Sequence, residues 1–447
     1  MSLRKRFLKD SAWVFMGRAL GSLFGIMIYA LLTRILPPDL VGGYFLAFSI
    51  ASTLALVATL GLPKTVIRLV AESLATDKTE LARQTIRYAF FLFLIAAIVI
   101  TIIFNLALGS FLSDHVFKSK ILADIIPLMS IWIVLLALRT MLAETFRGLS
   151  NLKLASIFGG PVSNLVTSSL LFLIWLFIDT SSVTYAVNAT LFGLLTSTII
   201  ASFLLFKHIR NFKSGGTQAF STLMIISLPL LITDLFQHLI SQSNIWVLGY
   251  FKSDSEVALY GTVLQVVLLV SLPFIIINNT VLPLIAKYNI TNRHAELEKI
   301  LRTVATLTSL PAIIVVIIVA IFGDSLLALV YGDYYRQSAS ALLWLACGQL
   351  VNVGCGSCGI TLMICGHQNR VMLVTGFSGI FAIILAILLV GRYGVTGVAA
   401  SAAISTALQN LIMLFQVKRQ IGIWTHASFS ASIFKQLKTG YPFKHDN

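Results

Sequence analysis

Two ionisable side chains stand one helical turn apart inside an otherwise apolar stretch of this 447-residue chain. Asp234 and His238 lie within residues 220–250, and their spacing of four places both on one face of a helix, which Gln242 continues. A carboxylate and an imidazole in apolar surroundings can carry a proton, because desolvation and neighbouring charge set their affinity for it. We predict Asp234 and His238 as ion-coupling residues. The alternative is an Asp–His pair that bonds to itself and locks two helices together.

Arginines in two other apolar stretches are candidates for binding an anion. Arg18 lies between Gly17 and Gly21, which keep the helix thin around it, and Arg139 lies close to the end of the fourth stretch. A guanidinium can bind a phosphate through two parallel hydrogen bonds, so we predict substrate contact for both arginines. The alternative for both is a side chain that reaches the membrane surface, and for Arg18 also an ion pair with Glu144.

The four cysteines lie close together, and two of them form a Cys355-x-x-Cys358 pair. Redox and zinc sites need solvent-accessible thiolates, whereas this segment is apolar. Its glycine-rich run 354–359 favours a bend or close helix packing instead. The sequence therefore predicts no metal site and no cofactor, and it contains no GxxxxGK[ST] nucleotide-binding loop.

The elements that must position these residues are membrane-spanning helices. Charged residues make up 11 % of the chain, against about 25 % in soluble domains. Lipid cannot satisfy exposed backbone groups, so a spanning chain forms helices of about 20 residues or a closed barrel, whose alternating segments are absent here. Apolar stretches of spanning length are predicted at 11–33, 44–62, 88–108, 122–143, 154–178, 186–206, 220–250, 258–286, 303–323, 339–364, 371–390 and 396–416.

The basic residues predict the orientation of these twelve spans. Of the 32 lysines and arginines, 24 fall in the terminal segments and the loops on their side of the membrane, and 6 fall on the opposite side. Cytoplasmic loops carry the excess of Lys and Arg, so both termini are predicted to be cytoplasmic. This topology, with attraction to anionic inner-leaflet lipids, explains the net charge of +15 without a nucleic acid partner.

A weak internal repeat divides the chain into halves. Residues 39–44 and 255–260 open the second and eighth spans, and residues 148–151 and 366–369 follow the fourth and tenth, at nearly the same offset. Each half has six spans, as in transporters that rock about a central site. The predicted parts are an N-terminal lobe at 1–206, a cytoplasmic linker at 207–219, a C-terminal lobe at 220–416 and a basic cytoplasmic tail at 417–447.

Several stretches resemble the polysaccharide flippases, which are related to multidrug-and-toxin extrusion (MATE) proteins and to the lipid II flippase. They are residues 31–44, 60–63, 244–249 and 393–400. The resemblance implies an all-α polytopic membrane protein with 12 transmembrane helices in two six-helix, MATE-like lobes around a central cavity. Relatives often carry Asp where this chain has Asn244, so this position provides no negative charge here. Asn244 joins Arg18, Arg139 and His238 as a candidate substrate-binding residue.

The resemblance also implies a function. It is the translocation of an undecaprenyl-pyrophosphate-linked oligosaccharide from the inner to the outer leaflet of a bacterial inner membrane, for O-antigen, capsule or exopolysaccharide synthesis. The expected partners are this glycan, membrane lipids and a glycan polymerase, and no catalysis is expected. Similarity to the lipid II flippase implies proton or sodium coupling at Asp234, although the polar residues of the eleventh span here are Thr375 and Ser378.

Two other functions stay open. A cation-coupled extruder of small molecules would present a largely acidic or aromatic cavity, whereas Arg18 favours an anionic cargo. A membrane-embedded glycan polymerase or glycosyltransferase would carry a large external loop with paired carboxylates or Arg and His clusters. The longest predicted external connector, near residues 112–120, is about a dozen residues and leaves no room for such a loop.

Overall fold

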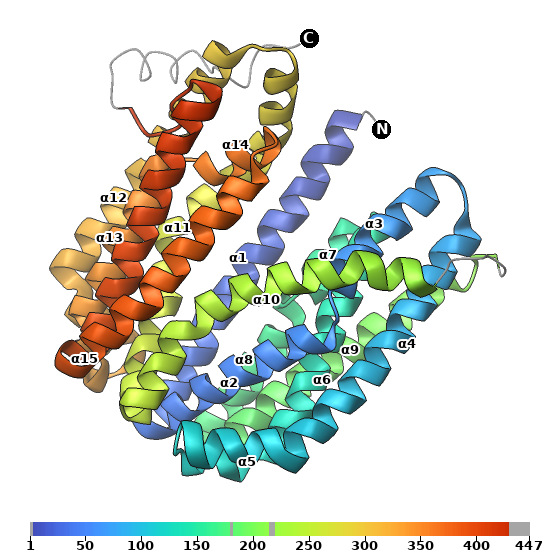
Figure 1. Cartoon of the computed structure of the whole chain (residues 1–447). Coiled ribbons are helices and arrows are strands. Elements are labelled where there is room, and N and C mark those ends of the chain that lie inside the picture. The colour runs from blue at the N-terminus through green and yellow to red at the C-terminus, as the bar shows by residue number, and fades with distance from the viewer. Residues whose placement is uncertain (1–2, 179–181, 214–219, 429–447) are drawn as a thin grey trace. The chain divides into compact units, whose positions relative to one another are not determined.

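A computed structural model describes residues 3–178, 182–213 and 220–428 (Figure 1). The helices are α1 (Leu3–Ile35), α2 (Pro38–Ala58), α3 (Leu62–Ala75), α4 (Thr79–Ile103), η1 (Phe104–Leu108), α5 (Gly109–Phe111), η2 (Leu112–Val116), α6 (Lys120–Gly148), α7 (Leu152–Phe158), α8 (Pro161–Phe177), α9 (Val183–Ile209), α10 (Phe220–Phe251), α11 (Asp254–Ile290), α12 (His294–Tyr331), η3 (Asp333–Ser338), α13 (Ala339–Cys355), α14 (Cys358–Ile364) and α15 (Gln368–Ile421).

The chain forms two compact units, residues 1–258 and 259–447, so α11 begins in the first unit and continues in the second. The predicted lobes divide instead at the linker 207–219. Residues 214–219 of that linker lie outside the described residues, as do residues 429–447 of the predicted tail. The division into lobes of six helices, and the cavity between them, stay predictions.

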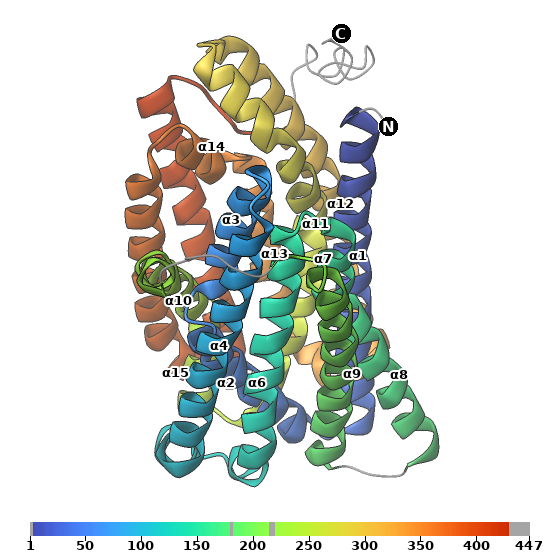
Figure 2. The ribbon, with the colours of Figure 1, turned by 90° about the vertical axis from the view of Figure 1, so that its right-hand side faces the viewer.

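In the first unit, α2 and α6 pack together around a buried tryptophan. The ring of Trp132 on α6 lies 5.2 Å from that of Tyr44 and 5.6 Å from that of Phe48, both on α2. Buried aromatic rings contribute large apolar areas and prefer such tilted contacts. Outside this pair, α6 packs on α9 and α9 on α8, and Figure 2 shows α4, α6, α9 and α8 standing in a row. α1 packs against α7 and α8.

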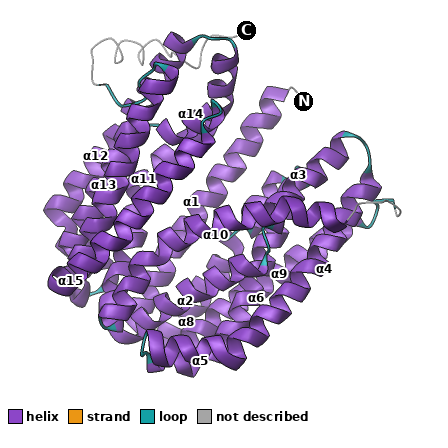
Figure 3. Cartoon of the chain, in the orientation of Figure 1, coloured by secondary structure: helices purple, strands orange, loops and turns teal. Residues whose placement is uncertain are grey.

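All regular structure in the described residues is helical (Figure 3), and 11 helical segments there are long and apolar enough to cross a membrane. One of them, α15, has 54 residues and would be ~80 Å long if straight, more than twice the ~30 Å hydrocarbon core. Gly394 in its middle has φ 51° and ψ −132°, which interrupts the helix. The interruption falls between the predicted spans 371–390 and 396–416. The chain is an all-α, multi-pass membrane protein.

Two predicted spans of the first unit contain breaks. Within the predicted span 44–62, α2 ends at Ala58. The next helix, α3, lies in the segment between the predicted spans 44–62 and 88–108. The span 154–178 is divided into α7 and α8, and Pro161 stands at the first turn of α8. Proline is accepted there because the first helical N–H groups have no partner within the helix. Apolar length alone therefore does not locate helix ends in this chain.

The bend predicted in the run 354–359 of the second unit is confirmed. α13 ends at Cys355 and α14 begins at Cys358, and both thiols are buried. Cys358 Sγ lies 3.7 Å from Asn410 Oδ1 on α15, in hydrogen-bonding range for a thiol. No group of three or more His, Cys, Asp or Glu side chains suited to a metal ion occurs in the described residues.

Residues 423–428, which we term the C-terminal strap, hydrogen-bond the backbone opened by this bend. Thr425 Oγ1 donates to the carbonyl oxygen of Cys355 at 2.7 Å, and the Ala427 N–H donates to the carbonyl oxygen of Gly354 at 2.8 Å. The Ser428 N–H donates to Thr306 Oγ1 of α12 at 2.9 Å. Thr425 is fully buried. The strap therefore supplies partners to carbonyl groups of the last turn of α13, which the end of the helix leaves without intrahelical partners.

Candidate functional site

A ladder of polar side chains runs along one face of α10 in the first unit. Asp234, His238, Gln242 and Trp246 follow one another at intervals of four, and each bonds to a side chain of α2 or α3. α10 packs against α2 and α3 in the same unit (Figure 1). We term this set and its partners the α10 ladder. The predicted common face of Asp234, His238 and Gln242 thus packs on the N-terminal helices.

The first contact of the ladder is an ion pair between Asp234 and Lys64 of α3. The Lys64 side chain is 53 % exposed and that of Asp234 is 21 % exposed. An unpaired charge deep in a membrane helix costs roughly 2.5–3.5 kcal/mol on insertion scales, so a cation beside the carboxylate offsets that cost. The alternative of a bonded Asp234–His238 pair is not what forms, since each residue bonds to a different helix.

Close contact between the turn after α2 and α10 brings Lys64 to its partner. Gly61 has φ 71°, and a Cβ on it would lie 2.2 Å from the carbonyl oxygen of Ser227 on α10. Ser227 lies two turns before Asp234, and Lys64 lies about one turn after Gly61. Glycine at this position therefore sets the distance between α3 and α10 that the ion pair requires.

Serines of α2 form the other contacts of the ladder. Ser52 Oγ lies 3.3 Å from His238 Nε2 and also donates to the carbonyl oxygen of Ser49 at 3.0 Å. A hydroxyl has one hydrogen, so with that bond made, Nε2 of His238 must carry the proton and donate. Ser49 is fully buried; its Oγ donates to Gln242 Oε1 at 2.9 Å and accepts from Trp246 Nε1 at 2.8 Å. Its hydroxyl is therefore the central hydrogen-bonding group of the ladder.

Arg18 is exposed on the surface of α1. The neighbouring Gly17 is buried, and a Cβ there would lie 2.8 Å from Ser156 Cβ on α7. The Arg18 guanidinium makes no hydrogen bond or ion pair with the residues that the structure describes. The alternative partner Glu144 is instead paired with Arg147 on its own helix.

Arg139 is partly buried between α6 and α8. Its Nη1 donates to Ser163 Oγ at 3.4 Å, and Ser163 Oγ in turn donates to the carbonyl oxygen of Gly160 at 2.8 Å. Ser163 lies in the first turn of α8, where the helix dipole is positive and offers a cation no stabilisation. Within the described residues, Arg139 thus has a hydroxyl partner but no carboxylate.

Asn244 does not share the face of the α10 ladder. It lies two residues beyond Gln242, which places it about 200° around the helix. Its side chain is buried, and its Oδ1 has no hydrogen-bond partner in the described part of the chain. The structure therefore brings Asp234 and His238 together but leaves Asn244, Arg18 and Arg139 apart from them.

Four members of the α10 ladder are not among the residues that the sequence singled out: Trp246, Lys64, Ser49 and Ser52. Lys64 belongs, in the hydropathy pattern, to a basic cytoplasmic loop. A signal for it exists in the Leu60-Gly61-Leu62-Pro63 sequence, because Gly followed by Pro marks a turn and a new helix start. Ser49 and Ser52 carry no comparable signal, since isolated serines are common in membrane helices.

The sequence matches the polysaccharide biosynthesis protein family over residues 7–289, more than half of the chain. The chain belongs to this family. Residues 229–388 also match the MatE family, which covers α11 to α14 and parts of α10 and α15. The resemblance to polysaccharide flippases is confirmed by these matches.

Individual relatives are distant. The chain is 21 % identical over 172 residues to the probable low-salt glycan biosynthesis flippase Agl15 of Haloferax volcanii, which covers 38 % of this chain and 36 % of that protein. The chain thus matches only about a third of that relative's length.

Solved structures share the fold. An inward-facing multidrug resistance MATE family transporter superposes with a TM-score of 0.76 at 16 % identity, covering 90 % of this chain and 94 % of the other. The lipid II flippase MurJ, in an inward closed conformation, gives 0.71 at 17 % identity, covering 97 % and 90 %. These likenesses confirm the predicted MATE-like fold. Together with the family match, they place the protein in a superfamily of flippases and transporters.

Proposed function

We propose that this family member translocates an undecaprenyl-pyrophosphate-linked oligosaccharide from the inner to the outer leaflet of a bacterial inner membrane. The glycan serves cell-surface polysaccharide synthesis, and both termini of the flippase are cytoplasmic. The match to a polysaccharide biosynthesis family and the fold shared with a lipid II flippase support this cargo class. The likeness to the probable low-salt glycan biosynthesis flippase Agl15 also supports it.

The observation that carries the proposal is the state of two arginines in membrane-spanning helices. Arg18 is exposed, and Arg139 has only a hydroxyl partner among the described residues. Cations in spanning helices that lack carboxylate partners are costly, and such residues mark ligand paths in membrane proteins. A pyrophosphate would offset this cost through charge-assisted, bidentate hydrogen bonds. The cargo is therefore anionic in this proposal.

A cation-coupled extruder of small molecules is the second candidate. The MatE match over residues 229–388 and the MATE fold favour it. Extruders of cationic compounds need an acidic group free to meet the cargo. The ion pair with Lys64 already neutralises Asp234, which leaves the anionic cargo as the better supported function.

The membrane potential supplies a driving force without an obligatory coupling ion. A pyrophosphate with about two negative charges gains roughly 4–5 kcal/mol per 100 mV on leaving an inside-negative cell, at ~2.3 kcal/mol per charge. A proton or sodium ion at Asp234 would have to compete with Lys64. We propose that coupling at Asp234 and His238 assists transport, so Asp234→Asn slows glycan export without abolishing it.

The test is complementation of a flippase-null strain, with surface glycan measured at matched membrane abundance. Arg18→Lys keeps the charge but loses the two-pronged hydrogen bonding, so we expect partial display. Arg18→Glu repels the phosphates, so we expect display to be abolished while the protein still inserts. Arg210→Glu, an exposed charge at the end of α9, is the matched control and should support normal display.

Two results would count against the proposal. Wild-type display by Arg18→Glu would identify Arg18 as a surface-directed side chain without a cargo role. Complete loss of export by Asp234→Asn, at normal abundance, would show that coupling at this carboxylate is obligatory.

A further inference from the structure

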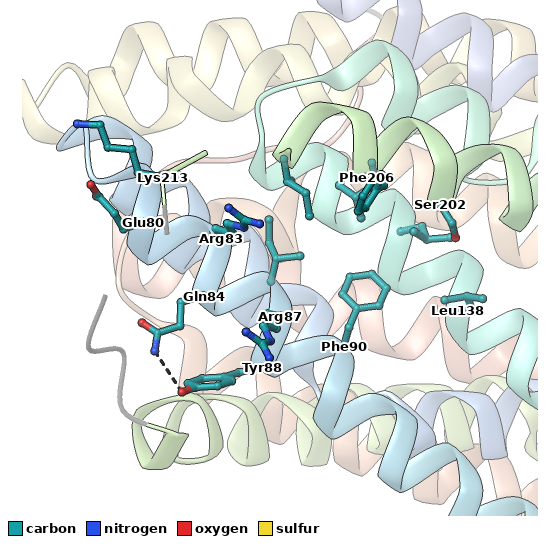
Figure 4. Close-up of a pocket in the computed structure, with 14 residues that line it drawn as sticks. Glu80, Arg83, Gln84, Arg87, Tyr88, Phe90, Leu138, Ser202, Phe206 and Lys213 are labelled. Carbon is teal, nitrogen blue, oxygen red and sulfur yellow. Dashed lines mark hydrogen bonds between the residues drawn. The ribbon is translucent and has the colours of Figure 1, made fainter. Parts of the chain in front are cut away.

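A pocket of about 630 Å³ lies in the first unit between α4, α6 and α9. This volume lies within the ~300–1,000 Å³ typical of small-molecule sites. None of the residues discussed above as candidate substrate or coupling residues lines it. Its two ends differ in chemistry, as the residues drawn in Figure 4 show.

The end nearest the start of α4 is polar and basic. Arg83, Arg87 and Lys213 stand there against one carboxylate, Glu80. Gln84 Nε2 donates to the Tyr88 hydroxyl at 3.2 Å beside them. Three cations against one anion leave a net positive site.

The loop after α9 is fixed to this end of the pocket. Arg83 Nη1 donates to the carbonyl oxygen of Phe212 at 2.8 Å, which ties that loop to α4. The Arg87 side chain is exposed and makes no hydrogen bond or ion pair with described residues. Arg87 is therefore the guanidinium that is available to a ligand.

The end deeper along the helices is apolar. Phe90 of α4, Leu138 and Leu142 of α6, and Leu205 and Phe206 of α9 form its walls. Along α4 the lining changes from charged to aromatic between Glu80 and Phe90, about 15 Å along the helix axis. A ligand that fills both ends must carry a negative headgroup on an apolar chain.

We propose that this pocket binds an anionic phospholipid. The lipid would come from the leaflet on the side of the membrane where α4 begins and α9 ends. The phosphate meets Arg87, and an acyl chain follows α4 and α9 past Phe90 and Phe206. Basic pockets between transmembrane helices recognise anionic lipid headgroups in this way. The inference goes beyond the proposed function and does not depend on which cargo the protein carries.

A zwitterionic lipid would match the apolar end equally but would present an ammonium group to an end with three cations and one carboxylate. A free phosphate would match the basic end and leave the apolar walls uncovered. An anionic lipid satisfies both ends, because it joins a negative headgroup to an apolar chain.

The experiment is native mass spectrometry of the full-length protein in detergent, titrated with phosphatidylglycerol and, separately, with phosphatidylethanolamine. We expect one phosphatidylglycerol to bind preferentially. Arg87→Gln should weaken that binding about five-fold, since a basic residue near the headgroups contributes on the order of 1 kcal/mol. Lys207→Gln removes an exposed charge from the same end of α9 outside the pocket and should leave binding unchanged.

A second pair of variants tests the apolar end. Ser202→Trp fills that end without changing charge and should lower phosphatidylglycerol binding, whereas Phe203→Trp, on the exposed surface of the same helix, should not. Melting temperatures without added lipid confirm that each variant is folded.

Three results would overturn the proposal. They are equal retention of both lipids by the wild type, equal binding by Arg87→Gln and Lys207→Gln, and displacement of phosphatidylglycerol by undecaprenyl phosphate. The last result would show that the pocket is a binding site for the cargo lipid instead. Glycan display that stays normal in Arg87→Gln would leave the inference intact, so the two proposals fail independently.

Discussion

The α10 ladder shows how polar residues are accommodated inside a membrane helix of this protein. Each of the four ladder side chains of α10 has a partner on α2 or α3, and Gln242 and Trp246 share Ser49, so hydrogen bonds and one ion pair replace contact with lipid. A polar group without a partner in hydrocarbon costs several kcal/mol. The ladder is therefore a specific polar interface between α10 and helices α2 and α3, and this holds independently of the part that Asp234 plays in ion coupling.

The Lys64–Asp234 pair makes a first prediction at this scale. Asp234→Asn and Lys64→Gln each leave one group without its partner. We expect both to lower the melting temperature and the double variant to lose less than their sum, with a coupling of about 0.5–3 kcal/mol. Thermal melting of the purified protein measures this double-mutant cycle. The exposed Arg68–Glu72 pair of α3 is the matched control, with an expected coupling of about 0.3–0.5 kcal/mol. Strict additivity at Lys64 and Asp234 would contradict the prediction.

Ser49 makes the second prediction. Ser49→Ala removes the acceptor of Trp246 Nε1 and the donor to Gln242, so both groups lose a partner at a fully buried position. We expect a loss of about 1–3 kcal/mol in the free energy of unfolding, measured by denaturant titration in detergent. Ser169→Ala, on an exposed face of α8, should change it by less than about 0.5 kcal/mol. Equal losses in the free energy of unfolding for the two variants would show that Ser49 is not the central hydrogen-bonding group of the ladder.

At the scale of helices, the close approach of the α2–α3 turn to α10 makes the third prediction. Gly61→Ala places a methyl group at φ 71° and against the backbone of Ser227. We expect α3 and α10 to separate, the ion pair to weaken and the melting temperature to fall, since strain of this kind costs about 1–3 kcal/mol before the clash is counted. Gly25→Ala, in α1 with no atom near its Cβ, should be neutral or stabilise by up to about 1 kcal/mol. A Gly61→Ala protein as stable as Gly25→Ala would show that the contact can relax.

The spanning helices were predictable because apolar length is a strong signal, and the break near Gly394 lies where the hydropathy falls. The turn at Gly61 and the amphipathic helix α3 were not located, since hydropathy merges a short polar helix with a loop. On α10, spacing alone predicted the shared face of Asp234 and His238. Their partners were not predictable, because which helix lies opposite depends on packing between segments almost 200 residues apart.

At the scale of the whole chain, the strongest asymmetry is the distribution of basic residues, 24 on one predicted side of the membrane and 6 on the other. The start of α4 and the end of α9, which carry Arg83, Arg87 and Lys207, belong to the basic side. With this orientation, the pocket between these helices is predicted to open at the leaflet with the stronger attraction for anionic headgroups.

This asymmetry gives the fourth prediction, which concerns orientation. We expect a fluorescent protein fused after residue 447 to be fluorescent, because it folds in the cytoplasm. Alkaline phosphatase inserted after Phe117, in the connector between η2 and α6, should be active because it reaches the other side. An insertion after Phe212, in the loop beyond α9, is the matched control and should be inactive. The reverse pattern would place both termini outside.

The C-terminal strap has a consequence for biosynthesis. Residues 423–428 are the last of the described residues to leave the ribosome, yet they complete the hydrogen bonds of a break some 70 positions earlier in the chain. We therefore expect the carbonyl groups of Gly354 and Cys355 to acquire these partners only after residues 423–428 have been synthesised.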